Sequence, residues 1–172
     1  MLTRLLFAAT LAGVFALPAV AGAHHGGSGI VGLTRIGDLK MDVSTEADVR
    51  AFAGEPDLVE VSPSSERITR LGYHCRERDE YDWVDCRTNY ELYRDSTLSG
   101  FYTVSKRFRT RRGTRVGHTR KRAERNERRK ADHNLCGGGT RAILRSGDHD
   151  LYILFDRRRV FEIVVDSTIV WC

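Results

Sequence analysis

The sequence predicts an α+β fold made of two half-repeats, each with one helix packed on antiparallel strands. The hydrophobic period changes from strand to helix and back to strand twice, once after residue 41 and once after residue 119. Segment 140–172 then alternates apolar and polar positions between short polar turns. This last pattern predicts a four-strand meander at the end of the chain.

The first 23 residues have the composition of a secretory signal peptide. Arg4 gives a cationic start, residues 5–17 are apolar, and small residues suited to cleavage occupy 19–21 and 21–23. The apolar stretch is shorter than the ~20 residues that a membrane-spanning helix needs, so we expect no transmembrane segment. The sequence therefore predicts export, with the mature chain secreted or held in the periplasm or cell envelope.

The mature chain is predicted to begin with a flexible leader at 24–33, which is rich in His and Gly. The first half-repeat covers 34–108 and opens with a predicted strand at Thr34–Met41. Ser44 or Thr45 is suited to cap the helix that follows, and Gly54 with Pro56 ends it. Four further strands are predicted at Leu58–Val61, Ile68–Arg76, Trp83–Tyr93 and Phe101–Phe108.

The second half-repeat covers 109–172. Its helix is predicted from about Thr119 to Asp132, with a thin apolar face of Ala123 and Ala131. Four strands follow, at Thr140–Arg145, Leu151–Phe155, Val160–Val165 and Ile169–Trp171. The expected core draws on both half-repeats and includes Ile36, Leu39, Val49, Phe52, Ile68, Leu71, Ile143, Leu144, Ile153, Phe155, Phe161, Val164 and Trp171.

Four cysteines, an even number in a chain predicted to be exported, indicate a disulfide framework. Three pairings are open. We favour Cys75 with Cys86 and Cys136 with Cys172, because each pair lies within its own half-repeat, and a hairpin of two predicted strands would bring Cys75 and Cys86 together. Zinc is the alternative, but Cys-x-x-Cys and His-x-x-x-His spacings are absent, so we expect no metal site.

The net charge of +5 conceals opposite charges in the two halves. Residues 24–103 carry 9 basic and 15 acidic side chains, whereas residues 104–172 carry 18 basic and 8 acidic ones. This polarity predicts an anionic partner or pairing between the halves. The basic side chains gather before and along the predicted helix of the second half-repeat, in a tract of Lys106, Arg107, Arg109, Arg111, Arg112, Arg115, Arg120, Lys121, Arg122, Arg125, Arg128, Arg129 and Lys130.

The basic tract is the strongest functional signal in the sequence. Guanidinium groups bind phosphate and carboxylate, and a cationic helix attracts polyanions with an affinity that falls as salt is added. No nucleic-acid-binding motif is present, so recognition of a specific DNA or RNA sequence is not expected. We predict a binding protein without cofactor whose partner is an anionic polymer, an anionic lipid surface or an acidic protein, contacted by Arg120, Lys121, Arg122, Arg125, Arg128, Arg129 and Lys130.

Other features support weaker alternatives. The acidic cluster from Glu77 to Asp85 could be a calcium site, but it lacks the spacing of a calcium-binding loop, so a solvated loop is expected there. His24 near the mature N-terminus could chelate copper or nickel. A small secreted enzyme is a third hypothesis, in which a histidine would act as the base; the candidates are His74, His118, His133 and His149. No serine lies in the Gly-x-Ser-x-Gly motif of a nucleophile that such a base would activate. Protein binding through a sheet face would use exposed aromatic side chains such as Tyr90, Tyr93, Phe101 and Tyr102.

Two short segments, Ile36–Met41 and Val116–Thr119, each precede a predicted helix and resemble a known family. Both are similar to a signature of SmpA/OmlA and BamE-like proteins, in which Gly, Met or a similar residue and Ser/Thr precede a helix that closes with Gly-x-Pro. The tandem units of β-lactamase inhibitory protein share this signature. The chain is also similar to small secreted actinobacterial proteins of unassigned role. These resemblances imply exported α+β modules that bind other proteins and are not enzymes. Because Asp42-Val43 and His118 depart from the pattern and a lipobox cysteine is absent, no functional residue of the family is carried over.

Overall fold

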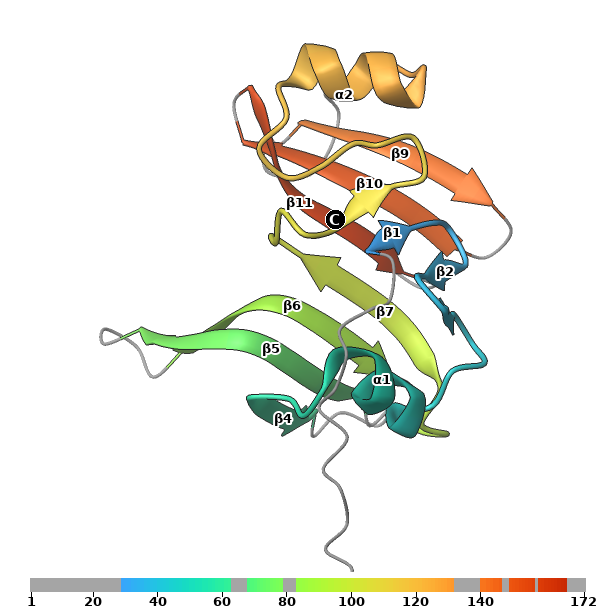
Figure 1. Cartoon of the computed structure of the whole chain (residues 1–172), viewed down its shortest axis with the longest axis vertical. Helices are drawn as coiled ribbons and strands as arrows, with labels where there is room; N and C mark the ends of the chain where they lie inside the picture. The colour runs from blue at the N-terminus through green and yellow to red at the C-terminus, as the bar shows by residue number, and fades with distance from the viewer. Residues whose placement is uncertain are drawn as a thin grey trace, which may run out of the picture.

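The computed structural model describes residues 29–62, 68–78, 83–131, 140–146, 149–156 and 158–166. Within them the chain forms two helices and two sheets, in the order β1-β2-β3-α1-β4-β5-β6-β7-β8-α2-β9-β10-β11 (Figure 1). This confirms the α+β class. The predicted signal peptide, Cys136, Cys172 and the last predicted strand lie outside the described residues.

A seven-stranded antiparallel sheet forms the centre of the described fold. The first four strands make a meander, and three strands from the C-terminal half extend it because β7 pairs with β11. The sheet therefore continues across the boundary between the two expected half-repeats. In spatial order its strands are β4 (Leu58–Val61), β5 (Thr69–Arg78), β6 (Trp83–Leu92), β7 (Leu98–Thr103), β11 (Arg159–Asp166), β10 (His149–Asp156) and β9 (Thr140–Ser146).

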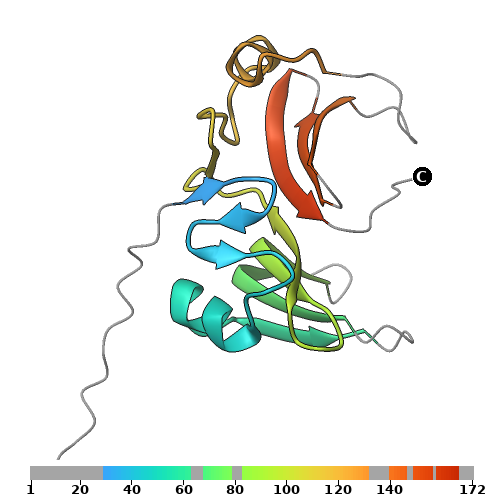
Figure 2. The same ribbon diagram turned by 90° about the vertical axis from the view of Figure 1, so that its right-hand side faces the viewer.

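A smaller sheet of order β3-β2-β1-β8 lies on the same side of the large sheet as both helices (Figure 2). Strand β1 pairs with β8 in parallel, and Val31 of β1 is fully buried. Residues 30–31, within the range 24–33 predicted to be a flexible leader, thus form a strand with a buried side chain. The strands are β1 (Ile30–Val31), β2 (Arg35–Ile36), β3 (Leu39–Lys40) and β8 (Arg109–Thr110).

Two of the predicted strands differ from the structure by more than a residue or two at their ends. The segment Thr34–Met41 is a tight hairpin of β2 and β3, because Gly37 adopts a φ of 60° and reverses the chain there. The strand predicted at Phe101–Phe108 begins earlier, at Leu98, and ends at Thr103. Beyond it the chain turns and places Phe108 against the core.

Helix α1 (Glu46–Ala53) forms where the sequence predicts it. Thr45 is its N-cap: the Thr45 hydroxyl accepts a hydrogen bond from the Asp48 N–H, and the Asp48 carboxylate accepts one from the Thr45 N–H at 2.8 Å. This reciprocal pair satisfies two backbone donors at the helix start. Val49 faces the core and is fully buried, and Gly54 ends the helix as expected.

Helix α2 (Arg120–Glu127) is capped by Thr119 and ends earlier than the predicted limit at Asp132. Arg128 adopts the left-handed conformation, with φ 54°, and its N–H donates to helical carbonyls. Only Ala123 and Glu127 of the helix are buried, so its apolar face is too small to extend the helix further. In the described part of the chain, neither helix has the length and apolar character needed to cross a membrane.

The two helices are attached to the large sheet in the same way. Ahead of α1, the N–H of Leu98 on β7 donates to the Ser44 carbonyl at 2.8 Å. Ahead of α2, the N–H of Val160 on β11 donates to the His118 carbonyl at 2.9 Å. The start of each helix is therefore fixed to one of the two strands that join the halves of the sheet.

The core lies between the large sheet and the layer made by α1, the small sheet and α2. A row of aromatic rings crosses it, from Tyr73 through Tyr90 and Phe101 to Phe108, with ring centroids 5.5, 5.2 and 5.0 Å apart. Among the predicted core residues whose side chains are described, Phe52 and Ile68 are half-buried. The prediction is confirmed for Ile36, Leu39, Val49, Leu71, Ile153 and Phe155, which are buried in this core. Val164 is buried too, but it is paired with Tyr102 on the other face of the sheet. Trp171 and the side chains of Ile143 and Leu144 lie outside the described part of the chain.

Phe161 was expected in the core, and this prediction is wrong. Its side chain is 42% exposed. Strand β11 pairs Glu162 with Leu154 but Val160 with Phe155, so Phe161 is the extra residue of a β-bulge. Simple alternation along the strand therefore assigns Phe161 to the wrong face.

The disulfide expected between Cys75 and Cys86 is present, and it joins directly opposed residues of β5 and β6. Gly72 on β5 lies against it: a Cβ atom at Gly72 would be 2.4 Å from the Cys86 sulfur and 3.0 Å from the Cys75 sulfur. Glycine is required here because a larger residue would overlap the disulfide.

The change Gly72→Ala is therefore expected to lower the free energy of unfolding by about 1–3 kcal/mol, the usual cost of overpacking. In a Cys75→Ala/Cys86→Ala background the same change should cost much less, because the sulfur atoms are gone. Urea unfolding of the four proteins measures both effects as a double-mutant cycle. An equal cost in both backgrounds would show that the disulfide is not what excludes a side chain at Gly72.

Candidate functional site

The seven basic residues predicted to bind a polyanion lie on and just after α2, and the structure divides them into two groups. Arg120 donates through Nε to Glu124 at 3.0 Å, and Lys130 lies 3.6 Å from the same carboxylate. The other five have no ion pair with any described residue. All five are exposed; we call them the cationic face, which consists of Lys121, Arg122, Arg125, Arg128 and Arg129.

The carboxylates of α2 are turned inward. Glu124 accepts hydrogen bonds from the Ala131 N–H and from Arg120, both at 3.0 Å. Partial burial raises the pKa of Glu124, but these hydrogen bonds outweigh it and hold the pKa below its ordinary value. The negative charge of Glu124 is thus engaged within the protein.

Glu127 is also turned inward, and its side chain is only 3% exposed. It accepts a hydrogen bond from the Thr110 hydroxyl at 2.5 Å, and its backbone carbonyl accepts one from Arg112 at 2.6 Å. These bonds attach the C-terminal turn of α2 to β8 and the turn after it. With Glu127 buried and Glu124 paired with Arg120 and Lys130, cations are in the majority on the outer surface of α2.

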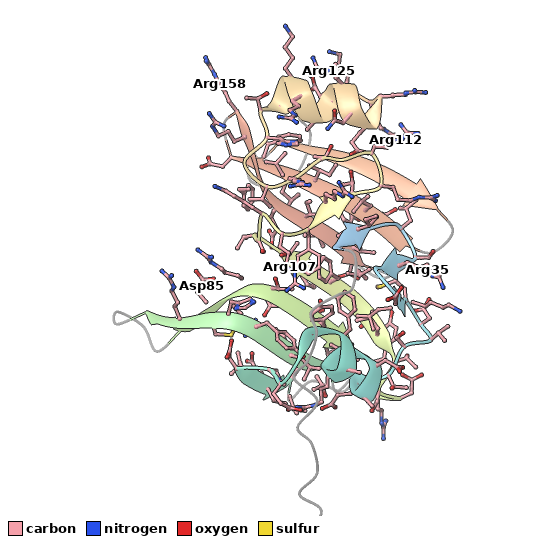
Figure 3. All side chains as sticks on the ribbon, viewed as in Figure 1. Arg35, Asp85, Arg107, Arg112, Arg125 and Arg158 are labelled. Carbon is pink, nitrogen blue, oxygen red and sulfur yellow. A yellow bond between two sulfur atoms is a disulfide. The ribbon has the colours of Figure 1, made fainter. Side chains whose placement is uncertain are left out.

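A hollow of about 350 Å³ lies on this surface, lined by Lys121, Glu124, Arg125, Arg128, Arg129 and Lys130. Figure 3 shows that Arg125 and Arg158 are at the same end of the molecule, with Arg112 just below α2. Arg158 is held close by backbone contact, since its carbonyl accepts the Arg120 N–H at 2.7 Å. Positive charge therefore extends beyond the helix itself.

The part of the basic tract that precedes α2 is exposed as well. It follows β8 and the turns on either side, and consists of Lys106, Arg107, Arg109, Arg111, Arg112 and Arg115. Of these, Arg111 and Arg112 lie close to Arg129 at the end of α2. Arg107 lies beside Phe52 and Tyr73 instead, so only part of the tract adjoins the cationic face.

Histidines do not assemble a catalytic group in the described part of the chain. His74 is exposed on β5. The Nδ1 atom of His118 accepts a hydrogen bond from the Arg115 N–H at 3.3 Å, and partial burial followed by the charges of Arg122 and Arg115 lowers the pKa of His118. Among the described residues, no group of three or more His, Cys, Asp or Glu side chains is placed to hold a metal ion. His24, His133 and most of the predicted acidic loop lie outside the described residues, and the His149 side chain is not described.

The aromatic residues proposed for a protein-binding sheet face are not all on the surface. Tyr90 is 1% exposed and Phe101 is fully buried, so both belong to the core, and this prediction is wrong for them. Their side chains point toward α1 and β8 because the alternation of β6 and β7 places them there. Tyr93 and Tyr102 are half-buried.

Tyr102 belongs to a polar cluster on the opposite face of the sheet, which the sequence analysis missed. Its hydroxyl is 3.2 Å from Glu91 and also contacts Asp166. A hydroxyl has one proton and can donate to only one of the two carboxylates at a time. Burial is the main cause that raises the pKa of Glu91, and the charge of Asp166 raises it further. Strand alternation could have shown that these residues avoid the core, but not that β6, β7 and β11 are neighbours.

No family model matches this sequence, and no curated protein matches it. Two solved structures are similar. One is a DUF4309 family protein (YjgB) from Bacillus subtilis subsp. subtilis str. 168, with 15% identity and a TM-score of 0.48 over 77% of this chain and 84% of that one. The other is an extracellular protein containing a SCP domain from Bacillus anthracis str. Ames, with 10% identity and a TM-score of 0.50 over 72% of this chain. This chain spans 43% of the latter protein, and the likeness concerns the fold alone.

The polar cluster makes stability depend on pH. A raised carboxyl pKa means that the folded protein binds a proton more tightly than the unfolded chain, so stability falls as pH rises through the folded pKa of Glu91. Glu91→Gln keeps an acceptor for Tyr102 but removes the charge. We expect this variant to be more stable than the parent at pH 7, with a shallower loss of stability between pH 4 and pH 7, measured by urea unfolding. A steeper loss in the variant would contradict this assignment.

Proposed function

We propose that the chain is an exported, non-enzymatic binding protein that holds an anionic polymer of the cell envelope on the cationic face of α2. The observation that carries the proposal is the separation of charge on this helix. Glu127 is buried and Glu124 is paired within the protein, whereas Lys121, Arg122, Arg125, Arg128 and Arg129 are exposed and have no ion pair with a described residue. Arginine forks in such an array suit the phosphate or carboxylate groups of a polymer.

The fold supports this proposal in a further way. We infer that the chain consists of two half-repeats of the inhibitor-like kind, since each helix starts from a Thr cap fixed to a sheet strand by the same backbone hydrogen bond. The equivalent positions differ in charge: the first turn of α1 carries Glu46 and Asp48, while α2 has no acidic residue there. On this view the C-terminal half-repeat has diverged toward cation display.

Export is supported by the Cys75–Cys86 disulfide, because such bonds persist in oxidising compartments. The description of one structural neighbour as an extracellular protein is in keeping with it. Protein binding through the sheet face is the weaker candidate, because two of its four aromatic residues, Tyr90 and Phe101, are in the core.

The export proposal predicts the mass of the mature protein. Material purified from the envelope fraction or the medium should lack about 23 N-terminal residues, the length of a signal peptide ended by small residues. Its four cysteines should resist alkylation until the protein is reduced. Intact mass spectrometry with and without reduction measures both properties. A full-length mass with freely alkylated thiols would overturn the proposal.

The binding proposal predicts a salt-dependent affinity for a polyanion, with inorganic polyphosphate as the probe. The triple change Arg122→Glu/Arg125→Glu/Arg129→Glu should weaken binding at least tenfold at 0.1 M salt. It should also reduce the slope of log K against log salt by about 2, because roughly 0.7 is lost per contact. Fluorescence anisotropy over a salt series measures both values.

A matched control carries the same charge change elsewhere. Arg35, Arg76 and Arg94 are exposed residues of the first half-repeat, away from α2. If the cationic face is the site, replacing these three by Glu should leave the salt slope near that of the parent, with only a small general loss of affinity. Equal losses in the two triple variants would show that net charge alone governs binding.

A further inference from the structure

Another hollow lies beside the cationic face and differs from it in chemistry. It has a volume of about 490 Å³ and is bounded by β1, β8, β10 and the C-terminal turn of α2. In Figure 1, α2 lies above β8 and β1, and β10 passes behind them. We call this hollow the cleft, and its lining consists of Val31, Gly32, Leu33, Thr110, Arg111, Arg112, Glu127, Arg129 and Leu151.

The floor of the cleft is apolar. Val31 is fully buried and Leu151 is 3% exposed, and both belong to the hydrophobic core. Leu33 is half-buried and packs against the same core. An aliphatic group lying here would therefore cover Leu33 in the main, because Val31 and Leu151 beneath it have almost no exposed surface left to cover.

The rim of the cleft is cationic. Arg112 and Glu127 are already engaged, since Arg112 donates to the Glu127 backbone carbonyl and the Glu127 carboxylate accepts from Thr110. Arg111 and Arg129 are exposed, and neither has an ion pair with a described residue. Two guanidinium groups thus border the apolar floor. The cleft as a whole is large enough for a small ligand, since pockets that bind small molecules have volumes of roughly 300–1,000 Å³.

From this arrangement we propose that the cleft binds an amphiphilic anion with a single aliphatic chain. Arg111 and Arg129 would hold its phosphate or carboxylate group, and the chain would lie over Val31, Leu33 and Leu151. A neutral lipid would leave the two guanidinium groups without partners, and a fully polar polymer would leave the exposed part of Leu33 in contact with water. The site goes beyond the proposed polyanion surface, and Arg129 alone borders both.

The test uses the full mature protein and a series of alkyl phosphates with four, six and eight carbons, measured by isothermal titration calorimetry. Each buried methylene is expected to tighten binding about fourfold, so that octyl phosphate binds up to about 200-fold more tightly than butyl phosphate. Equal affinity across the series would overturn the proposal, because it would leave only attraction of the phosphate group. Measurement on the parent protein makes this outcome independent of any variant.

Gly32 allows the cleft to be filled without disturbing the backbone. A Cβ atom there would be 3.5 Å from the Arg35 carbonyl oxygen and 3.8 Å from the Arg111 side chain, both ordinary contact distances. We expect Gly32→Phe to reduce the affinity for octyl phosphate at least tenfold, while Gly32→Ala changes it less than threefold. Near-ultraviolet circular dichroism checks that both variants are folded. Unchanged octyl phosphate affinity in folded Gly32→Phe would overturn the assignment of the cleft.

The charged rim is tested by Arg111→Gln/Arg129→Gln, with Arg122→Gln/Arg125→Gln as the matched control on the outer surface of α2. The first pair should weaken octyl phosphate binding at least tenfold, and the control should change it less than twofold. Polyphosphate separates this proposal from the one for the cationic face, because Gly32→Phe should leave polyphosphate binding unchanged. Loss of octyl phosphate binding in the control pair instead would place the amphiphile on the polyanion surface and overturn the cleft proposal.

Discussion

The pairing of β7 with β11 is the interaction on which the rest of the structure depends. Four residue pairs, from Thr103 with Ile163 to Gly100 with Asp166, join the N-terminal meander to the C-terminal one. Because each of these two strands also anchors the start of one helix through a backbone hydrogen bond, the pairing fixes where α1 and α2 lie on the sheet. It likewise brings Asp166 to Tyr102 and Glu91, residues far apart in the sequence, and so creates the buried polar cluster. Local sequence signals determine the individual helices and strands, and the pairing of β7 with β11 sets their relative positions.

Local patterns were enough to predict the elements that depend on local physics. The Thr45 cap, the acidic first turn and the closing Gly54 define α1 within a few residues, and alternation with polar breaks locates β4, β5 and β6.

Predictions are wrong where a partner distant in the sequence decides the position of a side chain. Phe161 was assigned to the core because alternation carries no sign of a bulge, and Tyr90 and Phe101 were assigned to the surface because the face of the sheet that α1 and β8 cover could not be known. Composition is enough to identify the basic tract. It does not show that the Glu127 side chain is buried, because that depends on the hydrogen bond from Thr110 of β8. The cleft depends in turn on the parallel pairing of β1 with β8, which joins segments that are distant in the sequence.

Helix α2 is poorly suited to stand alone. It has eight residues, and Arg120, Lys121 and Arg122 occupy its first turn, where the positive end of the helix dipole disfavours cations by about 0.3–1 kcal/mol each. Arg128 then adopts a left-handed backbone conformation, which costs a residue with a Cβ about 1–2 kcal/mol. Two side chains from outside hold the end of the helix, since Thr110 donates to the Glu127 carboxylate and Arg112 to the Glu127 carbonyl. Arg120 of the helix itself donates to the carbonyl of Ala131, just beyond it. These hydrogen bonds offset the unfavourable free energy of the cationic first turn and of the left-handed residue, which an ordinary amphipathic helix does not have.

A comparison with α1 shows that the unfavourable local features of α2 are not required by its place in the fold. Both helices have the same length, the same Thr cap and the same attachment to the sheet, yet α1 follows every local rule for helix stability and α2 breaks several. A sequence that only needed to cover the sheet could have used the charge pattern of α1 in both places. Departures from local stability that are compensated by distant contacts are expected where a surface serves a function. Three of the four residues that break the rules, Lys121, Arg122 and Arg128, are exposed and have no ion pair in the described chain. The fourth, Arg120, is paired with Glu124, so the cost in helix stability is linked only in part to the display of unpaired cations. The anion binding proposed for α2 would use this display.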